Sequence, residues 1–209
     1  MPVDVFAGVP ETELRQAGRR RTFSRGEVVF HEGDPGDSLH RVTRGRFAAR
    51  VTTPLGDVAT FSVHVPGEVF GLLAVLHAHG RRTATVAALE PAETFVLPAS
   101  AFARIRAAYP EVASAVEQLL VEMLVMSSGR LVEALYTPAR LRVHARLREL
   151  ARIYGESGAD RVTIPLSQED LAGLAGTTRE TVNRVLHDAQ GRDTVTLGRR
   201  KITVLLKRD

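Results

Sequence analysis

The sequence predicts an α+β fold: a double-sheet β-roll of the jelly-roll kind, then a long helix, then a winged helix-turn-helix. Residues 21–97 alternate short apolar runs with glycine- and proline-containing turns, which is typical of an all-β roll. An apolar stripe with helical spacing runs from Pro110 towards residue 135. After Ser167, two short amphipathic helical patterns and a hairpin pattern follow one another. These three observations predict the fold class and the order of its parts.

The first part of the chain is expected to hold a short helix at residues 11–18, followed by the β-roll. Glycine, proline and aspartate cluster between the apolar runs, as turns require. Phe47, Ala49 and Val51 alternate with other residues, so one face of their strand is expected to be buried. The expected strands are residues 28–30, 39–43, 47–51, 58–65, 69–72, 83–88 and 94–97.

A long helix is expected to begin at Pro110, because proline is favoured at the first helical position. Its apolar residues recur at the three- and four-residue spacing of a coiled-coil seam, which predicts a two-fold helix pair. The seam positions are Val116, Leu119, Met123 and Met126. The segment Ser127-Ser128-Gly129 interrupts this stripe and is expected to be a weak point, since glycine and serine are poor helix formers.

A hinge is expected where Thr137 and Pro138 can cap and open the next helix. This places three regions along the chain. They are a β-roll domain at residues 1–109, a helix and hinge at 110–136, and a winged helix-turn-helix domain at 137–209.

The helix-turn-helix pattern begins at Ser167, which can cap a first helix with Asp170 at the third helical position. Thr178 can cap a second helix in the same way. Small residues at Ala172 and Gly176 allow two helices to cross and turn tightly. Apolar residues then recur along one face of the second helix, so this face is expected to be buried.

The outward face of the second helix carries Arg179, Glu180, Asn183 and Arg184. Arginine can donate two hydrogen bonds to guanine in the major groove, and glutamate can accept one from cytosine. Because this motif docks the start of its second helix into the groove, these side chains are candidates for reading DNA bases. The alternative is an ordinary solvated charged surface, but the agreement of caps, crossing residues and outward charges favours DNA binding.

A hairpin with a basic tip follows the second helix. Its two strands flank the sequence Gly198-Arg199-Arg200-Lys201. Arg199, Arg200 and Lys201 are therefore expected to contact DNA phosphates as a wing. The charge distribution agrees, since residues 138–209 hold 14 Lys and Arg against 9 Asp and Glu, whereas residues 1–137 hold 14 against 15.

Composition excludes several classes of protein. The chain has no cysteine, so disulfides, thiolate zinc sites and cysteine-ligated iron–sulfur clusters are excluded. No apolar run approaches the roughly 20 residues that a membrane helix needs, and no basic-then-apolar leader opens the sequence. No catalytic-triad, Walker or dinucleotide-binding pattern is present. We therefore expect a cytoplasmic protein that is not an enzyme and has no membrane partner.

This layout resembles the CRP/FNR family of bacterial transcription regulators over nearly the whole chain. Similar segments include Glu32-Gly33-Asp34, Gly67-Glu68-Val69-Phe70-Gly71 and Arg82-Thr83-Ala84. The most specific is Arg179-Glu180-Thr181-Val182-Asn183-Arg184, which is similar to the family's recognition helix. The resemblance implies that the N-terminal part is a sensor like a cyclic-nucleotide-binding β-roll.

The resemblance also implies partners. A homodimer would bind a palindromic double-stranded DNA site with half-sites similar to TGTGA. Arg179, Glu180 and Arg184 would read its bases, while Gln168 and Thr178 would contact phosphates. RNA polymerase is the further partner that the resemblance implies.

A small-ligand pocket in the β-roll is implied in the same way. Its residues would be Gly71, Leu72, Arg82, Thr83, Ser127 and Ser128. In cyclic-nucleotide-binding members a glutamate follows the Phe-Gly pair and binds the ribose hydroxyl, whereas this chain has Leu72 there. A buried hydroxyl without a partner costs about 1–3 kcal/mol. We therefore expect cAMP to bind weakly or not at all, and Leu72→Glu to improve its binding.

Several alternatives stay open. The effector could be cAMP after all, another nucleotide or another anion. An internal carboxylate could replace it at Arg82 and make the regulator ligand-independent. His64, His77 and His79 leave a haem-based sensor as a remote alternative. A cupin-like metal enzyme is another, although no carboxylate accompanies these histidines at a suitable spacing. A ligand-binding module without DNA binding conflicts with the outward charges of the second helix.

Overall fold

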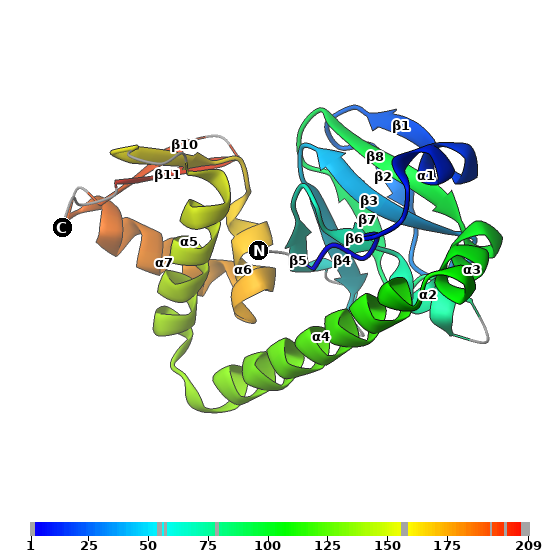
Figure 1. Cartoon of the computed structure of the whole chain (residues 1–209). Coiled ribbons are helices and arrows are strands. Elements are labelled where there is room, and N and C mark those ends of the chain that lie inside the picture. The colour runs from blue at the N-terminus through cyan, green and yellow to red at the C-terminus, as the bar shows by residue number, and fades with distance from the viewer. Residues whose placement is uncertain are drawn as a thin grey trace. The chain divides into compact units, whose positions relative to one another are not determined.

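The structure is a computed structural model that describes residues 3–53, 56, 58–77, 80–155, 159–192, 194–198 and 200–205. The chain forms two compact units, one of residues 1–51 and 62–128 and one of residues 52–61 and 129–209. The helices are α1 (Glu11–Ala17), α2 (Leu72–Leu76), α3 (Ala99–Ala108), α4 (Pro110–Tyr136), α5 (Ala139–Tyr154), α6 (Gln168–Ala175) and α7 (Arg179–Gln190) (Figure 1). Among the described helices, none has the length and apolar character that a membrane span needs.

The strands β1 to β8 form two four-stranded sheets, as the β-roll prediction requires. The strands are β1 (Arg19–Phe23), β2 (Val28–Phe30), β3 (Ser38–Arg44), β4 (Phe47–Thr52), β5 (Val58–His64), β6 (Val69–Phe70), β7 (Thr85–Ala88) and β8 (Ala92–Pro98). One sheet has the order β1-β8-β3-β6 and the other β2-β7-β4-β5. The pairs β1–β8, β3–β8, β3–β6, β2–β7 and β4–β7 are antiparallel.

Aromatic side chains fill the space between the two sheets. Phe23, Phe47 and Phe70 are all buried. The ring of Phe47 lies 5.4 Å from that of Phe23 and 5.3 Å from that of Phe70. Such tilted and edge-on aromatic contacts add to the free energy gained by burying apolar area. They fix the two sheets against each other and so define the interior of the roll.

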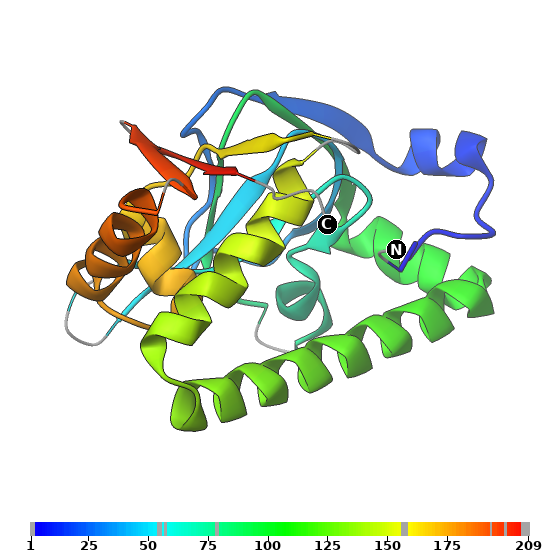
Figure 2. The same cartoon turned by 90° about the vertical axis from the view of Figure 1, so that its left-hand side faces the viewer.

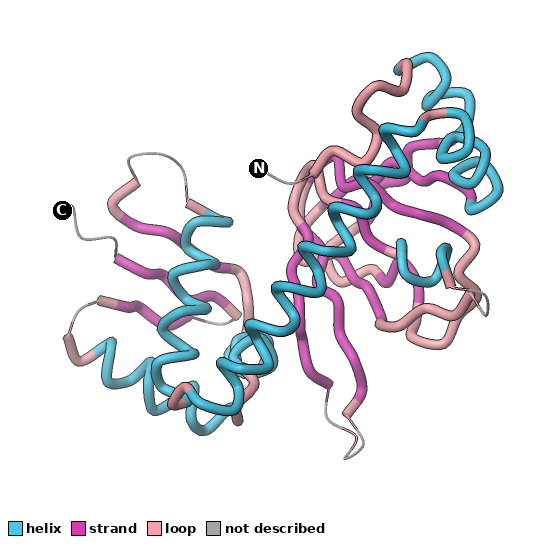
Figure 3. The backbone as a smooth tube through the Cα atoms, turned by 60° about the horizontal axis from the view of Figure 1, so that its bottom comes forward, coloured by secondary structure: helices cyan, strands magenta, loops and turns pink. Residues whose placement is uncertain are grey.

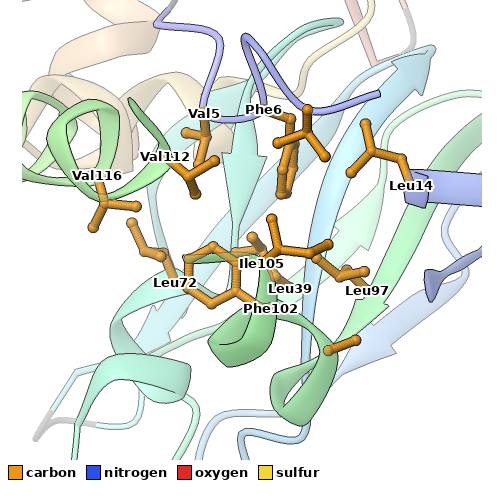
Figure 4. Close-up of a cluster of buried hydrophobic side chains, with 12 residues drawn as sticks. Val5, Phe6, Leu14, Leu39, Leu72, Leu97, Phe102, Ile105, Val112 and Val116 are labelled. Atoms are coloured by element: carbon orange, nitrogen blue, oxygen red, sulfur yellow. The ribbon is translucent and has the colours of Figure 1, made fainter. Parts of the chain in front are cut away.

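Helices cover the outer face of the first sheet. Leu39 and Leu97 of the sheet pack against Phe102 of α3 and Val112 of α4 in one apolar cluster (Figure 4). Leu72, at the start of α2, belongs to the same cluster and is 3% exposed. The first turns of α4 are therefore part of the core of this unit.

A short helix replaces the second half of the strand expected at residues 69–72. The strand β6 ends at Phe70, and Gly71 then adopts a φ of 84°, a backbone conformation that favours glycine. Helix α2 begins at the next residue. The apolar run from Val69 to Leu76, interrupted by Gly71, reads equally well as a buried strand or a buried helix, so the sequence pattern could not separate them.

This arrangement changes the expectation for position 72. Leu72→Glu is expected to destabilise the first unit by at least about 3 kcal/mol, because it would bury an unpaired charge among apolar side chains. The matched control is Leu73→Glu on the same helix, since Leu73 is 41% exposed. Chemical denaturation of the two variants would test this. Equal stabilities would show that residue 72 is not buried in solution.

Helix α4 is continuous through the expected weak point. It runs without interruption from Pro110 to Tyr136 and includes Ser127, Ser128 and Gly129, all of which are exposed (Figure 3). Pro110 occupies the predicted first position. Poor helix formers lower the stability of an exposed segment by about 1 kcal/mol each at most, which leaves a long helix intact.

The second unit contains the predicted winged helix-turn-helix. Helices α5, α6 and α7 pack with a three-stranded antiparallel sheet of order β10-β11-β9 (Figure 2). The strands are β9 (Arg161–Ile164), β10 (Val195–Gly198) and β11 (Lys201–Leu205). The apolar faces of the three helices and the sheet share one core, to which Leu147, Leu171 and Leu186 contribute buried side chains.

Two of the three expected helix caps are confirmed. Ser167 accepts a hydrogen bond from the backbone N–H of Asp170, whose carboxylate accepts one from the backbone N–H of Ser167. The Thr178 hydroxyl accepts from the backbone N–H of Thr181. The expected cap at Thr137 is wrong: α5 begins after Pro138, and no side chain caps it. Proline takes the cap position because its fixed φ suits the extended residue before a helix.

Candidate nucleic-acid interface and ligand cavity

Helix α7 has one buried face and one exposed face. Val182, Val185, Leu186 and Ala189 are buried and hold it against the rest of the second unit. Residues on the opposite side of the helix are left for contact with another molecule. The Thr178 cap satisfies an N–H group at the start of the helix, so the first turn is ordered where a DNA contact would be made.

All four candidate base-reading residues lie on the exposed side. Arg179, Glu180, Asn183 and Arg184 are each exposed. They occupy the first two turns of α7, the part that enters deepest into the major groove in this motif. Two guanidinium groups, a carboxylate and an amide together offer the donors and acceptors that base edges require.

The predicted phosphate contacts lie at the start of each helix and in the hairpin. Gln168 is the first residue of α6 and is half-buried, and Thr178 is the exposed cap of α7. Strands β10 and β11 pair from Val195–Val204 to Gly198–Lys201, which places Arg200 and Lys201 at an exposed tip. Arg199 lies outside the described residues.

Helix α4 presents a second exposed feature, an apolar face. Val112 and Val116 are buried in the core of the first unit, but most large apolar residues from position 121 onwards are exposed. They are Val121, Leu124, Val125, Met126, Leu131, Val132, Leu135 and Tyr136. An exposed apolar surface of this extent on one helix is typical of a protein–protein interface.

Two of the four seam positions expected from the sequence are occupied by contacts within the first unit. Val116 is already buried within its own unit, and Leu119 packs against the same cluster. Met123 is half-buried and Met126 is exposed, so nothing in the structure tests these two seam positions. A second set of exposed residues also keeps coiled-coil spacing: Val121, Leu124, Ser128, Leu131 and Leu135. The core of the first unit covers one side of the helix and leaves another side exposed.

The first unit contains a cavity of about 680 Å³ in the β-roll, and this cavity is open to solvent. It is lined by β1, β2, β3 and β8 and by the segments at residues 34–38 and 82. Half of the lining residues are charged or aromatic: Arg19, Arg21, Arg82, Asp34, Asp37, His40 and Phe30. The volume suits a small ligand, and three arginines favour an anion.

Arg82 is the central group of this cavity. It is 3% exposed, and its guanidinium lies 4.0 Å from the centre of the Phe30 ring. Nη1 donates to the backbone oxygen of Ser38 at 2.8 Å, and Nη2 donates to the Asp37 carboxylate at 3.0 Å. Burial lowers the pKa of Arg82, and Asp37 counters that lowering. A Cβ at Gly71 would lie 2.5 Å from Nη1, so glycine at this position leaves room for the guanidinium where it lies.

His40 forms part of the same lining and is buried. Its Nδ1 lies 3.1 Å from the Thr94 hydroxyl, and its ring stacks on Phe70. Burial, followed by the charges of Arg82 and Arg21, lowers the pKa of His40 to about 3. The histidine is therefore neutral at physiological pH and adds hydrogen-bonding groups, not charge, to the cavity.

Each half of the chain matches a known protein family. Residues 20–109 match the cyclic nucleotide-binding domain family, and residues 141–208 match the Crp-like helix-turn-helix domain family. The "CRP-like cAMP-activated global transcriptional regulator" of Mycobacterium tuberculosis is 30% identical over 205 residues, which cover 96% of this chain and 91% of that protein. The chain belongs to the CRP/FNR family of transcription regulators.

Other relatives support the same assignment. The "Cyclic AMP receptor protein" of Thermus thermophilus is 32% identical over 180 residues, covering 86% of this CRP/FNR regulator and 81% of that protein. The solved structure of FixK2 from Bradyrhizobium japonicum superposes with a TM-score of 0.77 at 21% identity, covering 91% of this chain and 93% of that one. The latter shows the fold. CRP/FNR proteins are transcription regulators and not enzymes, in agreement with the prediction.

Only some of the predicted ligand residues of this CRP/FNR regulator lie at the cavity. Arg82 lines the cavity, with Gly71 beside its guanidinium. Leu72 points into the helix-covered apolar cluster instead, so it is not a ligand contact in the cavity (Figure 4). The other three predicted ligand residues are exposed and are not in the cavity lining: Thr83, Ser127 and Ser128.

Sequence reasoning missed the other charged residues of the cavity. Arg19 and Arg21 are exposed, but they alternate with buried Phe23 in β1, and a two-residue period puts all three on the same face of that strand. That alternation could have identified them. Nothing local in the sequence indicates that Asp37, 45 residues away, reaches Arg82.

The histidines considered for haem or metal binding are dispersed. His77 is exposed, and His64 lies near Glu68 and Ser62. His79 lies outside the described residues. Over the described ranges, no group of three or more His, Cys, Asp or Glu residues could hold a metal ion.

Proposed function

We propose that this CRP/FNR regulator is a cytoplasmic homodimer that reads a palindromic DNA site with TGTGA-like half-sites. The observation that carries the proposal is made in the first half of α7, which follows the Thr178 cap. Four side chains are exposed together there: Arg179, Glu180, Asn183 and Arg184. The apolar face of α4 supports the two-fold assembly that a palindrome requires. RNA polymerase is the further partner expected of a regulator of this family.

Selection of bound sequences from random duplex DNA tests this function directly. The full-length protein should enrich an inverted repeat whose half-sites are about one helical turn apart. Enrichment of a single, unrepeated half-site would contradict the dimer, and no enrichment would contradict sequence-specific binding. The same selection with added cAMP or cGMP would show whether a nucleotide changes affinity.

We further propose that the β-roll cavity binds a small anionic effector at Arg82. The cavity volume and three lining arginines support this ligand class. Nε of Arg82 is buried and, within the part of the chain that the structure describes, has no hydrogen-bond partner, so one donor is left for a ligand. Leu72 faces the apolar cluster and supplies no carboxylate for a ribose hydroxyl, so cAMP is expected to bind weakly or not at all.

Asp37 competes with such an anion for Arg82. Asp37→Asn should raise the affinity for inorganic phosphate or cAMP about tenfold, because it removes a negative charge next to the binding arginine. The Asp37 side chain is 80% exposed, so the fold should tolerate the change. Calorimetric titration would measure this, with Glu111→Gln as the control. Tight cAMP binding by the wild type, unchanged in Asp37→Asn, would contradict the proposed cavity.

A ligand-independent regulator is the second candidate. The Asp37 carboxylate already pairs with Arg82 at 3.0 Å and could act as an internal substitute for the effector. In that case Asp37→Asn should weaken DNA binding in the absence of any small ligand, whereas effector control predicts no such loss. A DNA titration of the two proteins in phosphate-free buffer distinguishes the two candidates.

A further inference from the structure

The guanidinium group of Arg142 joins four backbone carbonyl groups at the hinge of the second unit. Arg142 lies in the first turns of α5. Its Nη1 donates to the oxygens of Ala134 at 3.2 Å and Thr137 at 2.6 Å. Its Nε donates to the oxygen of Ala175 at 2.8 Å, and Nη2 donates to that of Gly176 at 2.7 Å. One side chain therefore links the end of α4 to the turn between α6 and α7.

The carbonyl groups at the end of α4 lack their usual partners for a reason visible in the sequence. In a helix, the oxygen of Ala134 would accept from the N–H of residue 138, but Pro138 has no N–H. Thr137 donates to the preceding carbonyl, that of Glu133, so the ladder ends there. Arg142 supplies the missing donor to Ala134 and adds a positive charge where the helix dipole is negative.

The carbonyl groups at the end of α6 are in a similar position. Gly176 has a φ of 58° and closes α6, with its N–H directed back to Ala172 and Gly173. The oxygens of Ala175 and Gly176 then point out of the helix towards Arg142. Thr178, the cap of the recognition helix, is two residues further along. Arg142 therefore caps two helices at once and lies next to the start of α7.

We infer that Arg142 is a positioning residue that fixes the direction of the recognition helix relative to the end of α4. It does not contact DNA bases itself. Because α4 carries the proposed dimer face, this direction sets the separation of the two recognition helices and hence the preferred half-site spacing. The inference rests on the proposed homodimer and names a residue that selects between DNA sites of different spacing.

Replacing Arg142 is expected to change the orientation of the winged helix without unfolding it, because neighbouring contacts remain. Arg146 of α5 pairs with Glu133 of α4 at 2.8 Å, and this ion pair also joins the two helices. Arg146 pairs in addition with Glu149 of its own helix at 2.7 Å. The apolar core of the winged helix lies around Leu147 and Leu171, independently of Arg142. Replacing Arg142 should therefore leave a folded domain whose orientation is less fixed.

The test is the affinity of the full-length protein for palindromes whose spacer is lengthened or shortened by one or two base pairs. The wild type should lose at least about tenfold in affinity away from its best spacing, because rigid recognition helices cannot follow the half-sites. Arg142→Ala should lose about tenfold at the best spacing but vary by less than about threefold across the series. Its base preference within one half-site should not change.

Two further variants keep the test decisive. Arg142→Lys retains the charge but has a single ammonium group that cannot reach four carbonyls, so it should behave like the alanine variant. Arg148→Ala, an exposed arginine on the same helix, should keep the wild-type spacing profile. Thermal unfolding of each variant reports the stability of the domain.

The possible outcomes separate the inference from the proposed function. If Arg142→Ala kept the spacing profile of the wild type, the inference would be overturned. A changed base preference in this variant would overturn it too. So would a loss of affinity that is equal at every spacing and at a lone half-site. A wild type with no preference for any spacing would contradict the palindromic homodimer itself, and the role of Arg142 with it.

Discussion

Leu124→Glu is expected to convert the protein from a dimer to a monomer and to abolish its binding to a palindromic site. Leu124 is 68% exposed on α4 and lies at the centre of the exposed apolar face, between Val121 and Leu131. In a two-fold helix pair, each substitution would meet its symmetry-related copy and bury two like charges. An unpaired buried charge costs about 3–5 kcal/mol, so the dissociation constant should rise at least about a hundredfold.

The register of the seam decides which residue matters. Met126→Glu is the matched control: Met126 is a large apolar residue on the same helix, 51% exposed, but it lies off the spacing that joins Val121, Leu124 and Leu131. Met126 does belong to the seam expected from the sequence alone. Sedimentation velocity at micromolar concentration should give a monomer for Leu124→Glu and a dimer for Met126→Glu. The reverse result would restore the sequence-based seam, and a monomeric wild type would contradict the dimer altogether.

The seam illustrates why a stripe of apolar residues does not identify its partner. Residues such as Val112, Val116 and Leu119 recur at helical spacing because they complete the core of the first unit. The exposed set recurs at the same spacing on another side of α4. A helix that is apolar on two faces gives one merged pattern in the sequence. Only the position of the β-roll shows which part of that pattern is already buried.

The winged helix could be predicted almost completely because its determinants are local. The Ser167 and Thr178 caps, the αL conformation of Gly176 and the hairpin tip each depend on a few consecutive residues. Local rules for caps and turns are therefore sufficient there. The short helix α2 and the uncapped start of α5 were mispredicted because apolar runs and X-Pro sequences allow more than one local structure.

The ligand cavity and the hinge depend on contacts that sequence spacing does not encode. Arg82 reaches Asp37 across 45 residues, and Arg142 reaches Gly176 across 34. Two of the four Arg142 acceptors, Ala175 and Gly176, lie 33 and 34 residues along the chain, so spacing in the sequence does not indicate them. The resemblance to the family identified Arg82 but also placed Leu72, Thr83 and two serines in the same pocket. Residue-by-residue transfer fails there because the side chain at position 72 has become apolar and joins the core.

Arg179→Ala and Arg184→Ala are each expected to weaken binding to the specific site by about 1–3 kcal/mol and to relax preference at one base position. Both side chains are exposed in the first two turns of α7, where a bidentate contact with guanine can form. Neither contributes to the buried face of the helix, so the stability of the domain should not change. Sequence selection with each variant would give the base preference, and titration at fixed salt would give the affinity.

The control for this pair is a basic residue that should not read bases. Arg200 lies at the exposed tip of the β10–β11 hairpin. Arg200→Ala should weaken all sequences alike and lower the salt dependence by about one released counterion, because a phosphate contact carries no sequence information. The base-reading variants should therefore change sequence preference, whereas the hairpin variant should change only the overall affinity and its salt dependence. If Arg179→Ala left the selected sequence unchanged while Arg200→Ala altered it, α7 could not be the element that enters the major groove.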